Sequence, residues 1–303
     1  MDGTLVTLAA GSLELLLAPA VGGCIAAFDY IGPDRRIPIM RGDRRKPASV
    51  LDAASFPLVP FVNRIRGGAF RFRGREVRLA PNMVGDPSPL HGQGWLSLWK
   101  VVDSSGTSAV LRFDHEAGEW PWSYAAHQHF ALDSAGLALD LRCVNRSAEP
   151  MPCGLGQHPY FLCTADTLLD TLVRTAWTID EHVLPVAKVP AEGRFDLRQR
   201  RVCGQGLDHG FGGWSGQATI ATVGQPFTLS MSSPDAAFFQ LYSPEDGGLF
   251  VAEPVSHANA ALNAPEDEWE ALGMRVLEPG EAMNLSMRID VIPAWEGHGN
   301  PRD

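Results

Sequence analysis

The chain has 303 residues, of which 45% are hydrophobic and 20% charged, an ordinary globular composition with ample material for a core. Its net charge of −10 argues against nucleic acid or an anionic membrane as the main partner, because both require basic surfaces. The apolar run at residues 13–17 is interrupted by Glu14 and far too short to cross a bilayer, so we expect a soluble, cytoplasmic monomer or homodimer.

Short runs of alternating apolar and polar residues dominate the chain, and no stretch shows the sustained 3.6-residue periodicity of a long helix. In the first part of the chain, residues 4–8 and 12–17 predict a hairpin, and a glycine-loosened strand follows from residue 21 to residue 28. Residues 70–79 predict a second hairpin, with aromatic and aliphatic side chains on one face, arginines on the other and Gly74 at the turn.

The same alternation continues to the end of the chain. Residues 109–113 and 127–132 predict strands, and residues 137–143 alternate almost perfectly, so one face should be buried and the other solvated. Residues 283–291 predict the closing strand of an antiparallel sheet, after a turn at 278–281. Many short antiparallel strands favour a β-sandwich. Because no linker or internal repeat divides the sequence, we expect one domain over residues 1–303, with a frayed tail at 296–303.

Two features are predicted to have no direct role in function. The basic run at residues 34–46 also contains acids and prolines, which favours a solvated loop. The cysteines are odd in number and lack Cys-x-x-Cys spacing, which favours reduced thiols over a disulfide framework or a zinc site; they are Cys24, Cys143, Cys153, Cys163 and Cys203.

His158 and Glu253 occupy sequence contexts that suit reactive groups. His158 lies between a predicted strand end and an aromatic pair, and Pro159 interrupts the strand because it removes a ladder donor. We therefore expect the imidazole to point into a cavity or cleft. Glu253 ends an apolar strand just before Pro254, a position that suits a partly buried base of raised pKa and equally suits a structural carboxylate.

Other segments contain polar residues of the kind a sugar pocket needs. His91 lies in a loop with glycines on its C-terminal side, which allow a ligand to approach the backbone closely. Arg64 follows Asn63 in an apolar run and requires either an ion-pair partner or a cavity, because burying an unpaired cation is costly. Asp208 either hydrogen-bonds a ligand hydroxyl or caps a turn.

In this combination and order, these segments resemble the aldose 1-epimerases, or galactose mutarotase-like proteins. The resemblance extends over nearly the whole chain, from about Val21 to Val291. The five matching segments are Asn63-Arg64-Ile65, Leu90-His91-Gly92, His158-Pro159-Tyr160-Phe161, Asp208-His209-Gly210-Phe211, and Glu253 with the asparagine-bearing loop after it. Five motifs in order make the resemblance specific, whereas each alone is weak.

The resemblance implies an all-β, large antiparallel β-supersandwich and the cofactor-free interconversion of the α and β anomers of a free aldose. It also implies that Glu253 is the general base and His158 the general acid. The residues implied to hold the sugar are Asn63, Arg64, His91 and Asp208. The chemistry agrees, because mutarotation needs one base, one acid and no metal. At ordinary pKa values the carboxylate is ionised and the imidazole can still be protonated near neutral pH, which predicts a bell-shaped pH profile.

Three alternatives stay open. A metal enzyme would combine the two site histidines with Asp208 or Glu253, although such sites usually use a closely spaced histidine pair. A non-catalytic carbohydrate-binding protein of the same fold would not need a paired glutamate and histidine. A hexose-6-phosphate 1-epimerase would need extra cations at the pocket rim, for which the candidates are Arg66, Arg71 and Arg73.

Overall fold

The computed structural model describes residues 4–42 and 47–294, which form strands and short 3₁₀ turns. The tail predicted at 296–303 lies outside the described residues. The strands are β1 (Val6–Ala10), β2 (Leu13–Ala18), β3 (Cys24–Ile31), β4 (Arg36–Pro38), β5 (Pro57–Leu58), β6 (Ala69–Phe72), β7 (Arg75–Arg78), β8 (Lys100–Ser104), β9 (Ser108–His115), β10 (Tyr124–Leu132), β11 (Gly136–Asn145), β12 (Met151–Cys153), β13 (Gly156–Gln157), β14 (Tyr160–Leu162), β15 (Thr167–Thr171), β16 (Thr175–Ile179), β17 (Pro185–Pro190), β18 (Arg200–Arg201), β19 (Leu207–Gly212), β20 (Gln217–Thr222), β21 (Phe227–Ser232), β22 (Phe238–Ser243), β23 (Leu249–Val255), β24 (Arg275–Leu277) and β25 (Ala282–Pro293). The 3₁₀ turns are Val50–Asp52, Arg66–Gly68, Gly94–Leu96, Gly193–Phe195, Ala261–Asn263 and Glu266–Glu268.

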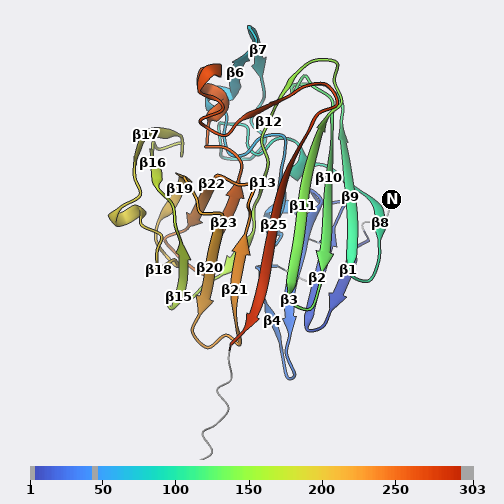
Figure 1. Cartoon of the computed structure of the whole chain (residues 1–303), viewed down its shortest axis with the longest axis vertical. Coiled ribbons are helices and arrows are strands. Elements are labelled where there is room, and N and C mark those ends of the chain that lie inside the picture. Colours follow the sequence, from blue (N-terminus) through green and yellow to red (C-terminus); the bar gives the residue numbers. More distant parts are fainter. Residues whose placement is uncertain (1–3, 43–46, 295–303) are drawn as a thin grey trace, which may run out of the picture.

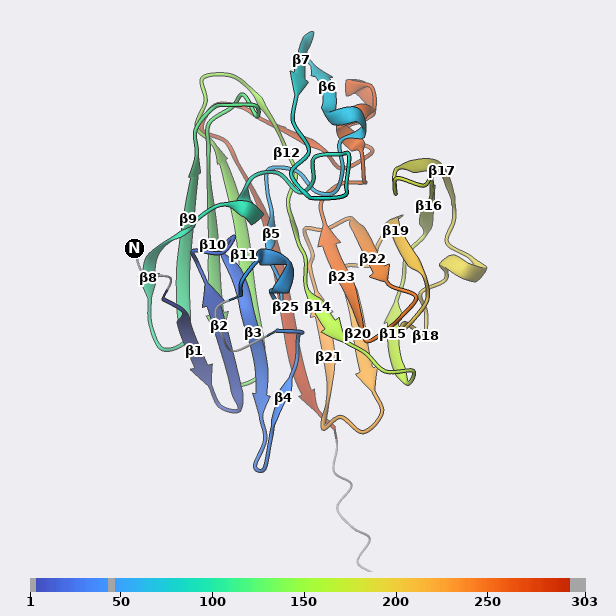
Figure 2. The ribbon, with the colours of Figure 1, turned by 180° about the vertical axis from the view of Figure 1, so that it is seen from behind.

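The strands build two layers that pack face to face (Figures 1 and 2). Over the described residues, one layer is a nine-stranded sheet with the order β18-β15-β20-β21-β25-β11-β10-β9-β8. The other layer contains the sheet β1-β2-β3-β4 and the sheet β17-β16-β19-β22-β23-β13-β5, in which β14 also pairs with β23. Neighbouring strands in these sheets run antiparallel. The all-β antiparallel sandwich predicted from the sequence is therefore confirmed.

The alternating segments of the sequence become the strands at the centre of the nine-stranded sheet. In β11 the residues Leu137, Leu139 and Leu141 are buried between the layers, while Asp140 between them is exposed. This is the pattern of a strand with one buried and one solvated face. The strand predicted to close a sheet, β25, lies inside this sheet between β21 and β11 and not at an edge. Its position in the chain gave no information on its neighbours in space.

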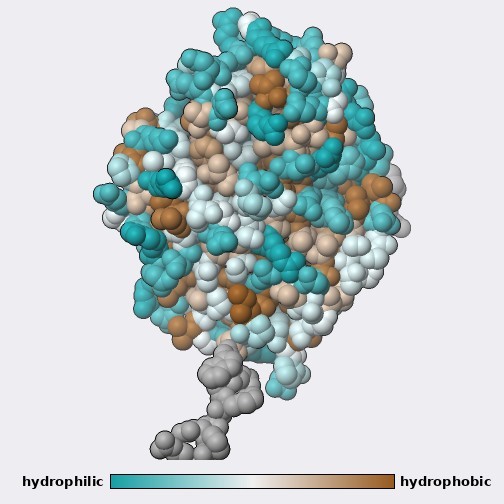
Figure 3. Space-filling model, viewed as in Figure 1, coloured by the Kyte–Doolittle hydropathy of each residue, from teal (hydrophilic) through white to brown (hydrophobic). Residues whose placement is uncertain are grey.

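The predicted second hairpin forms as β6 and β7 and projects at one end of the molecule (Figure 1). Gly74 has a φ of 78°, which supports the predicted turn. On the face shown in Figure 3, hydrophobic residues lie singly or in small groups among polar ones. None of the described segments is a helix long and apolar enough to cross a membrane.

The structure corrects the prediction that all cysteines are free. Cys163, just after β14, forms a disulfide with Cys203, which lies between β18 and β19. Their sequence separation is 40 residues, and the Cα atoms are 5.7 Å apart, within the range that a disulfide spans. Spacing in the sequence gave no sign of this pair because it is created by the adjacency of two distant loops. The other three cysteines are buried free thiols.

Candidate active site

One pocket of about 160 Å³ contains every residue predicted to form a site. It opens where β13, β14, β19, β22 and β23 meet the loops before β6 and after β7. The predicted residues that line it are Asn63, Arg64, His91, His158, Asp208 and Glu253. The same pocket is walled by Leu90 and Tyr160, which belong to the matching segments, and by residues that the sequence did not single out, namely Leu51, Phe56, Met83, Trp95 and Tyr242.

His158 lies at the break between β13 and β14, where Pro159 interrupts the strand as predicted. Its backbone N–H donates to the carbonyl of Phe56 at 3.1 Å, and its ring stacks on the Phe56 ring with centroids 4.3 Å apart. Burial, together with a smaller effect of the positive charge of Arg41, lowers the pKa of His158 to about 3. The Nδ1 atom is buried without a hydrogen-bond partner among the described residues.

Glu253 lies on β23, and 2% of its surface is exposed. Its Oε1 atom is 3.6 Å from Nε2 of His158, which is too far for a direct hydrogen bond. The Oε2 atom is buried and has no partner among the described residues. Burial raises the pKa of Glu253 well above its usual value, and the nearby Asp208 carboxylate raises it further. Burial disfavours both charged forms, so the protonation expected from ordinary pKa values is reversed: Glu253 is favoured protonated and His158 neutral.

His91 and Asn63 are joined by two hydrogen bonds, one accepted by the His91 imidazole and one between their backbones. The N–H of Asn63 donates to Nδ1 of His91 at 3.1 Å, and the N–H of His91 donates to the carbonyl of Asn63 at 3.0 Å. The Nδ1 atom therefore acts as an acceptor, so the neutral ring carries its proton on Nε2. Burial lowers the pKa of His91 well below its usual value. The adjacent Gly92 has a φ of 71°, and a Cβ there would lie 2.1 Å from the carbonyl oxygen of Val59, so this loop requires glycine.

Arg64 satisfies both interpretations made from the sequence. Its Nε donates to Asp86 at 2.9 Å, an ion pair between two loop segments, and the residue also lines the pocket. Its backbone N–H donates to Oδ1 of Asn259 at 3.1 Å. The salt bridge leaves the direction of the guanidinium fixed, so Arg64 presents a positioned positive charge to the pocket.

Gln240 is a residue that sequence reasoning missed. It is buried on β22 directly opposite Glu253 of β23. Its Nε2 donates to Oδ1 of Asp208 at 2.8 Å, and its Oε1 accepts from Nδ2 of Asn63 at 3.4 Å. Gln240 thus orients two pocket residues, Asp208 and Asn63. A lone amide in the apolar run Phe238–Ser243 was the available signal, but its role depends on strand register.

Other residues singled out from the sequence lie outside this pocket. Arg66 pairs with Asp180 at 3.2 Å, Arg71 donates to the carbonyl of Gly74, and Arg73 lies 3.5 Å from Glu278. In the part of the chain that the structure describes, no group of three or more histidine, cysteine, aspartate or glutamate side chains is arranged to hold a metal ion. The metal-enzyme alternative therefore finds no ligand set there.

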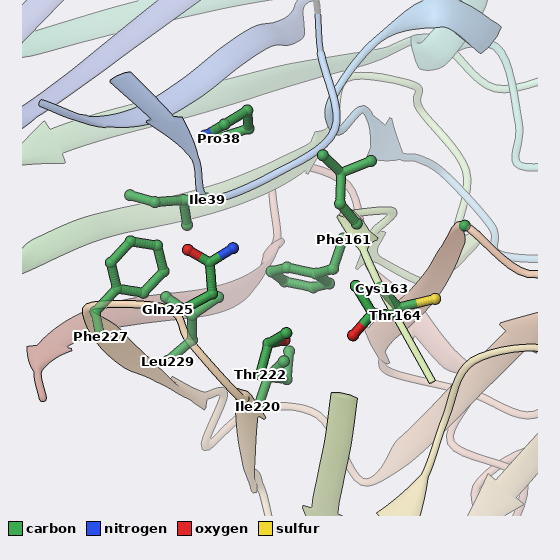
Figure 4. Close-up of a pocket in the computed structure, with 12 residues that line it drawn as sticks. Pro38, Ile39, Phe161, Cys163, Thr164, Ile220, Thr222, Gln225, Phe227 and Leu229 are labelled. Atoms are coloured by element: carbon green, nitrogen blue, oxygen red, sulfur yellow. The ribbon is translucent and has the colours of Figure 1, made fainter. Parts of the chain in front are cut away.

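A second cavity, of about 360 Å³, is formed by other parts of the chain (Figure 4). Its walls include Ile39, Phe161, Phe227 and Leu229, and the described residues lining it include no histidine, lysine, arginine, aspartate or glutamate. Proton-transfer chemistry requires titratable groups. The smaller pocket around His158 and Glu253 is consequently the candidate active site.

Comparison with known proteins agrees with this geometry. The sequence model of the family described as aldose 1-epimerase matches residues 4–290. The chain belongs to the aldose 1-epimerase family. It is 32% identical over 301 residues to the uncharacterized protein YphB of Escherichia coli K12, which covers 95% of this chain and 99% of YphB.

Solved structures of this family share the fold. A crystal structure of an Escherichia coli K12 protein, named after the same family, superposes with a TM-score of 0.86 at 31% identity and covers 96% of this chain and 99% of that one. A galactose mutarotase-like protein from Clostridium acetobutylicum superposes with a TM-score of 0.83 at 18% identity, covering 97% and 96% of the two chains. The family assignment makes a sugar the expected kind of substrate for this epimerase-family pocket.

Proposed function

We propose that this member of the aldose 1-epimerase family is a mutarotase that interconverts the α and β anomers of a free aldose. The observation that carries the proposal is the separation of 3.6 Å between Glu253 Oε1 and His158 Nε2 inside a buried pocket. Mutarotation acts on two oxygens bonded to one carbon, the anomeric hydroxyl and the ring oxygen. A base and an acid that serve these two oxygens must therefore lie close to each other.

The reaction follows from these positions. Glu253 accepts the proton of the anomeric hydroxyl, whose O–H electron pair forms the carbonyl bond. The bond between C1 and the ring oxygen breaks, and that oxygen takes a proton from His158. Rotation about the C1–C2 bond presents the other face of the aldehyde, and the reverse proton transfers close the ring. Atoms and charges balance without a metal or a nucleophile.

The pair needs to carry one proton in total for this cycle. Ring opening leaves Glu253 protonated and His158 neutral, which is also the distribution that burial favours. Because the two groups interact at short range, their titration belongs to the pair and not to either residue alone. The proton distribution that burial favours therefore matches the one that follows ring opening. For the ring of a cyclic sugar to open, the proton must first move from Glu253 to His158.

A neutral sugar fits the surrounding charges better than a phosphorylated one. The arginine that lines the pocket, Arg64, is already paired with Asp86, and Asp208 adds a carboxylate to the same wall. Arg66, suggested as a phosphate ligand at the rim, is paired with Asp180. These carboxylates would repel a phosphate group. A non-catalytic sugar-binding site is also less suitable, because burying two titratable groups that each keep an unsatisfied polar atom is costly and serves no purpose in binding alone.

The test is polarimetry of freshly dissolved α-glucose, α-galactose, α-xylose and glucose 6-phosphate, with and without prior EDTA treatment. We expect the neutral aldoses to equilibrate faster than in buffer, and chelation to leave the rate unchanged. The Glu253→Gln protein, purified in the same way, controls for contaminating mutarotase from the expression host. If no aldose is turned over, or if EDTA abolishes the activity, the proposal is wrong.

A further inference from the structure

Arg41 belongs to the basic run that the sequence analysis interpreted as a solvated loop. Residues 43–46 of that run lie outside the described residues, but the side chain of Arg41 is half-buried and held on all sides. Its Nε donates to the carbonyl of Ala53 at 3.2 Å, and its Nη2 donates to the carbonyls of Leu51 at 2.5 Å and Ala53 at 2.6 Å. A solvated loop residue does not require three such bonds.

The guanidinium of Arg41 lies over the ring of Tyr160. Its central carbon is 3.6 Å from the ring centroid, and its backbone N–H donates to the Tyr160 carbonyl at 2.8 Å. The N–H of Tyr160 in turn donates to the carbonyl of Ala54 at 2.8 Å. Arg41 therefore fastens β14 to the turn at Val50–Asp52 through both its backbone and its side chain. A planar cation on an aromatic face is a favourable arrangement.

Tyr160 transmits this restraint to His158. The rings of Tyr160 and His158 have centroids 4.7 Å apart, and Phe56 covers the imidazole at 4.3 Å. Phe56 in turn stacks on Trp95 at 5.4 Å. The imidazole is thus one member of a stack of contacting planar groups, tilted by 43° between Tyr160 and His158, that has Arg41 at one end and Trp95 at the other. A displacement of Arg41 would remove the support from one side of this stack.

The charge of Arg41 acts on His158 as well. Protonation of the imidazole is disfavoured mainly by burial and, to a smaller extent, by the nearby positive charge of the guanidinium. The other titratable groups that face the same pocket are Glu253, His91, Arg64, Asp208, Tyr160 and Tyr242. Of these, Glu253 is in ion-pair range of the imidazole and would stabilise a positive charge there only when ionised.

We propose that Arg41 is a positioning residue that fixes the His158 imidazole through Tyr160. Its positive charge adds to burial, which is the larger effect, in disfavouring protonation of His158. The inference rests on the proposed mutarotase function, in which His158 exchanges a proton with the ring oxygen. Arg41 does not line the pocket, so its effect should fall on turnover and leave sugar binding intact.

The experiment compares Arg41→Met, which keeps a flexible unbranched stem and removes the charge, with Arg41→Lys, which keeps the charge and removes the planar fork. Arg36→Met is the matched control, because Arg36 lies in the same segment and pairs with Glu14 and Asp29 at 2.9 Å, away from the stack. For each protein, circular dichroism checks folding and polarimetry gives kcat and KM. NMR gives the pKa of His158, whose signal is assigned by its loss in His158→Asn.

We expect Arg41→Met to lower kcat by about tenfold while KM stays within about twofold, because positioning affects the reacting state. We expect the pKa of His158 to rise in Arg41→Met and to stay low in Arg41→Lys, whose kcat should be intermediate. Arg36→Met should match the wild type in both measurements.

A folded Arg41→Met protein with wild-type kcat and an unchanged His158 titration would overturn the inference, and so would a loss confined to KM. If Arg41→Met does not fold, Arg41→Lys decides: intermediate kcat with unchanged KM supports positioning, and full kcat contradicts it. If the wild type turns over no aldose, the proposed function fails, and the NMR comparison alone decides whether Arg41 controls the protonation of His158.

Discussion

The polar residues around the pocket are held by partners outside the reacting pair. His91 accepts from the backbone of Asn63, and Arg64 is fixed by Asp86. In contrast, Glu253 Oε2 and His158 Nδ1 are buried with no partner among the described residues. An unsatisfied buried polar atom costs about 1–3 kcal/mol of folding free energy. Such a cost is typical of functional sites, where groups are kept available for a substrate.

At this scale the first prediction concerns the pair itself. Glu253→Gln keeps the size of the side chain and removes the base, and His158→Asn removes the acid. Each substitution should lower kcat by about 10²-fold or more, the range of positioned general acid–base catalysis, while the fold survives. If both act in one concerted step, the double variant should be scarcely slower than either single variant. Polarimetry measures the rates; near-full activity of Glu253→Gln would exclude Glu253 as the base and make Asp208 the next candidate.

The second prediction is the pH dependence of kcat/KM, which reports the titration of the free protein. The active pair carries one proton. Activity should be lost in acid when His158 is also protonated, at a pKa of about 3, so that the pair carries two protons. It should be lost in base when Glu253 releases its proton, at a pKa well above the usual carboxyl value, so that the pair carries none. Both limbs thus differ from the profile expected for exposed groups. An acidic limb near pH 6.5 would contradict the effect of burial on His158.

The residues of this site could be predicted because each stands out chemically in its local sequence. Glu253 follows an apolar strand, and His158 precedes a proline. Their protonation could not be predicted, because it depends on burial and on charges from distant segments such as Asp208. The positions of Gln240 and Arg41 were missed for the same reason: one acts through strand register, and the other through a ring stack.

At the scale of elements, strands with regular alternation were predicted within a few residues. Residues 137–143 lie in β11, and residues 283–291 lie in β25. The two-residue strand β13 and the short strand β14 could not be predicted, because a few residues give no periodicity. They form because tertiary contacts provide partners: Gly156 of β13 pairs with both Leu58 and Val255.

The third prediction concerns the disulfide that ties two site-bearing strands. Cys163 follows the strand next to His158, and Cys203 precedes the strand that contains Asp208. Closing a loop with a sequence separation of 40 residues limits the unfolded chain, so Cys203→Ser should lower the free energy of unfolding by about 2–4 kcal/mol. Urea unfolding measures this change. Dithiothreitol should destabilise the wild type by a similar amount and leave Cys203→Ser unaffected; equal sensitivity of both proteins would show that the bond is not formed in solution.

At the scale of the whole molecule, the sandwich class was predictable and the order of its strands was not. Alternation shows that a strand has one buried face, but it carries no information on which strand lies beside it. The pairing of β5 with β13, for example, joins Leu58 to Gly156. A single domain over residues 1–303, a monomer or homodimer, and a cytoplasmic location all stay predictions.

The last prediction is the pH dependence of the stability of the whole molecule. Besides His158, the fold buries His257, whose Nε2 accepts from the N–H of Val62 at 3.0 Å and whose Nδ1 donates to the carbonyl of Ala258 at 2.8 Å. This bonding requires a neutral ring, and burial lowers the pKa of His257 to about 4. In the unfolded chain the histidine pKa is about 6.5, so the unfolded state binds more protons between these values.

The free energy of unfolding should therefore be highest above pH 6.5 and fall as the pH drops towards 4, by roughly 3 kcal/mol for His257 alone. The raised pKa of Glu253 acts in the opposite sense, because its ionisation above the usual carboxyl pKa destabilises the fold, so it offsets part of the loss in acid. Urea unfolding at pH 7.5 and pH 5 measures the sum. His257→Gln can accept from Val62 and donate to Ala258 but cannot titrate, so the difference between the two pH values should shrink in this variant. An unchanged difference would show that His257 is not the group whose protonation opens the fold.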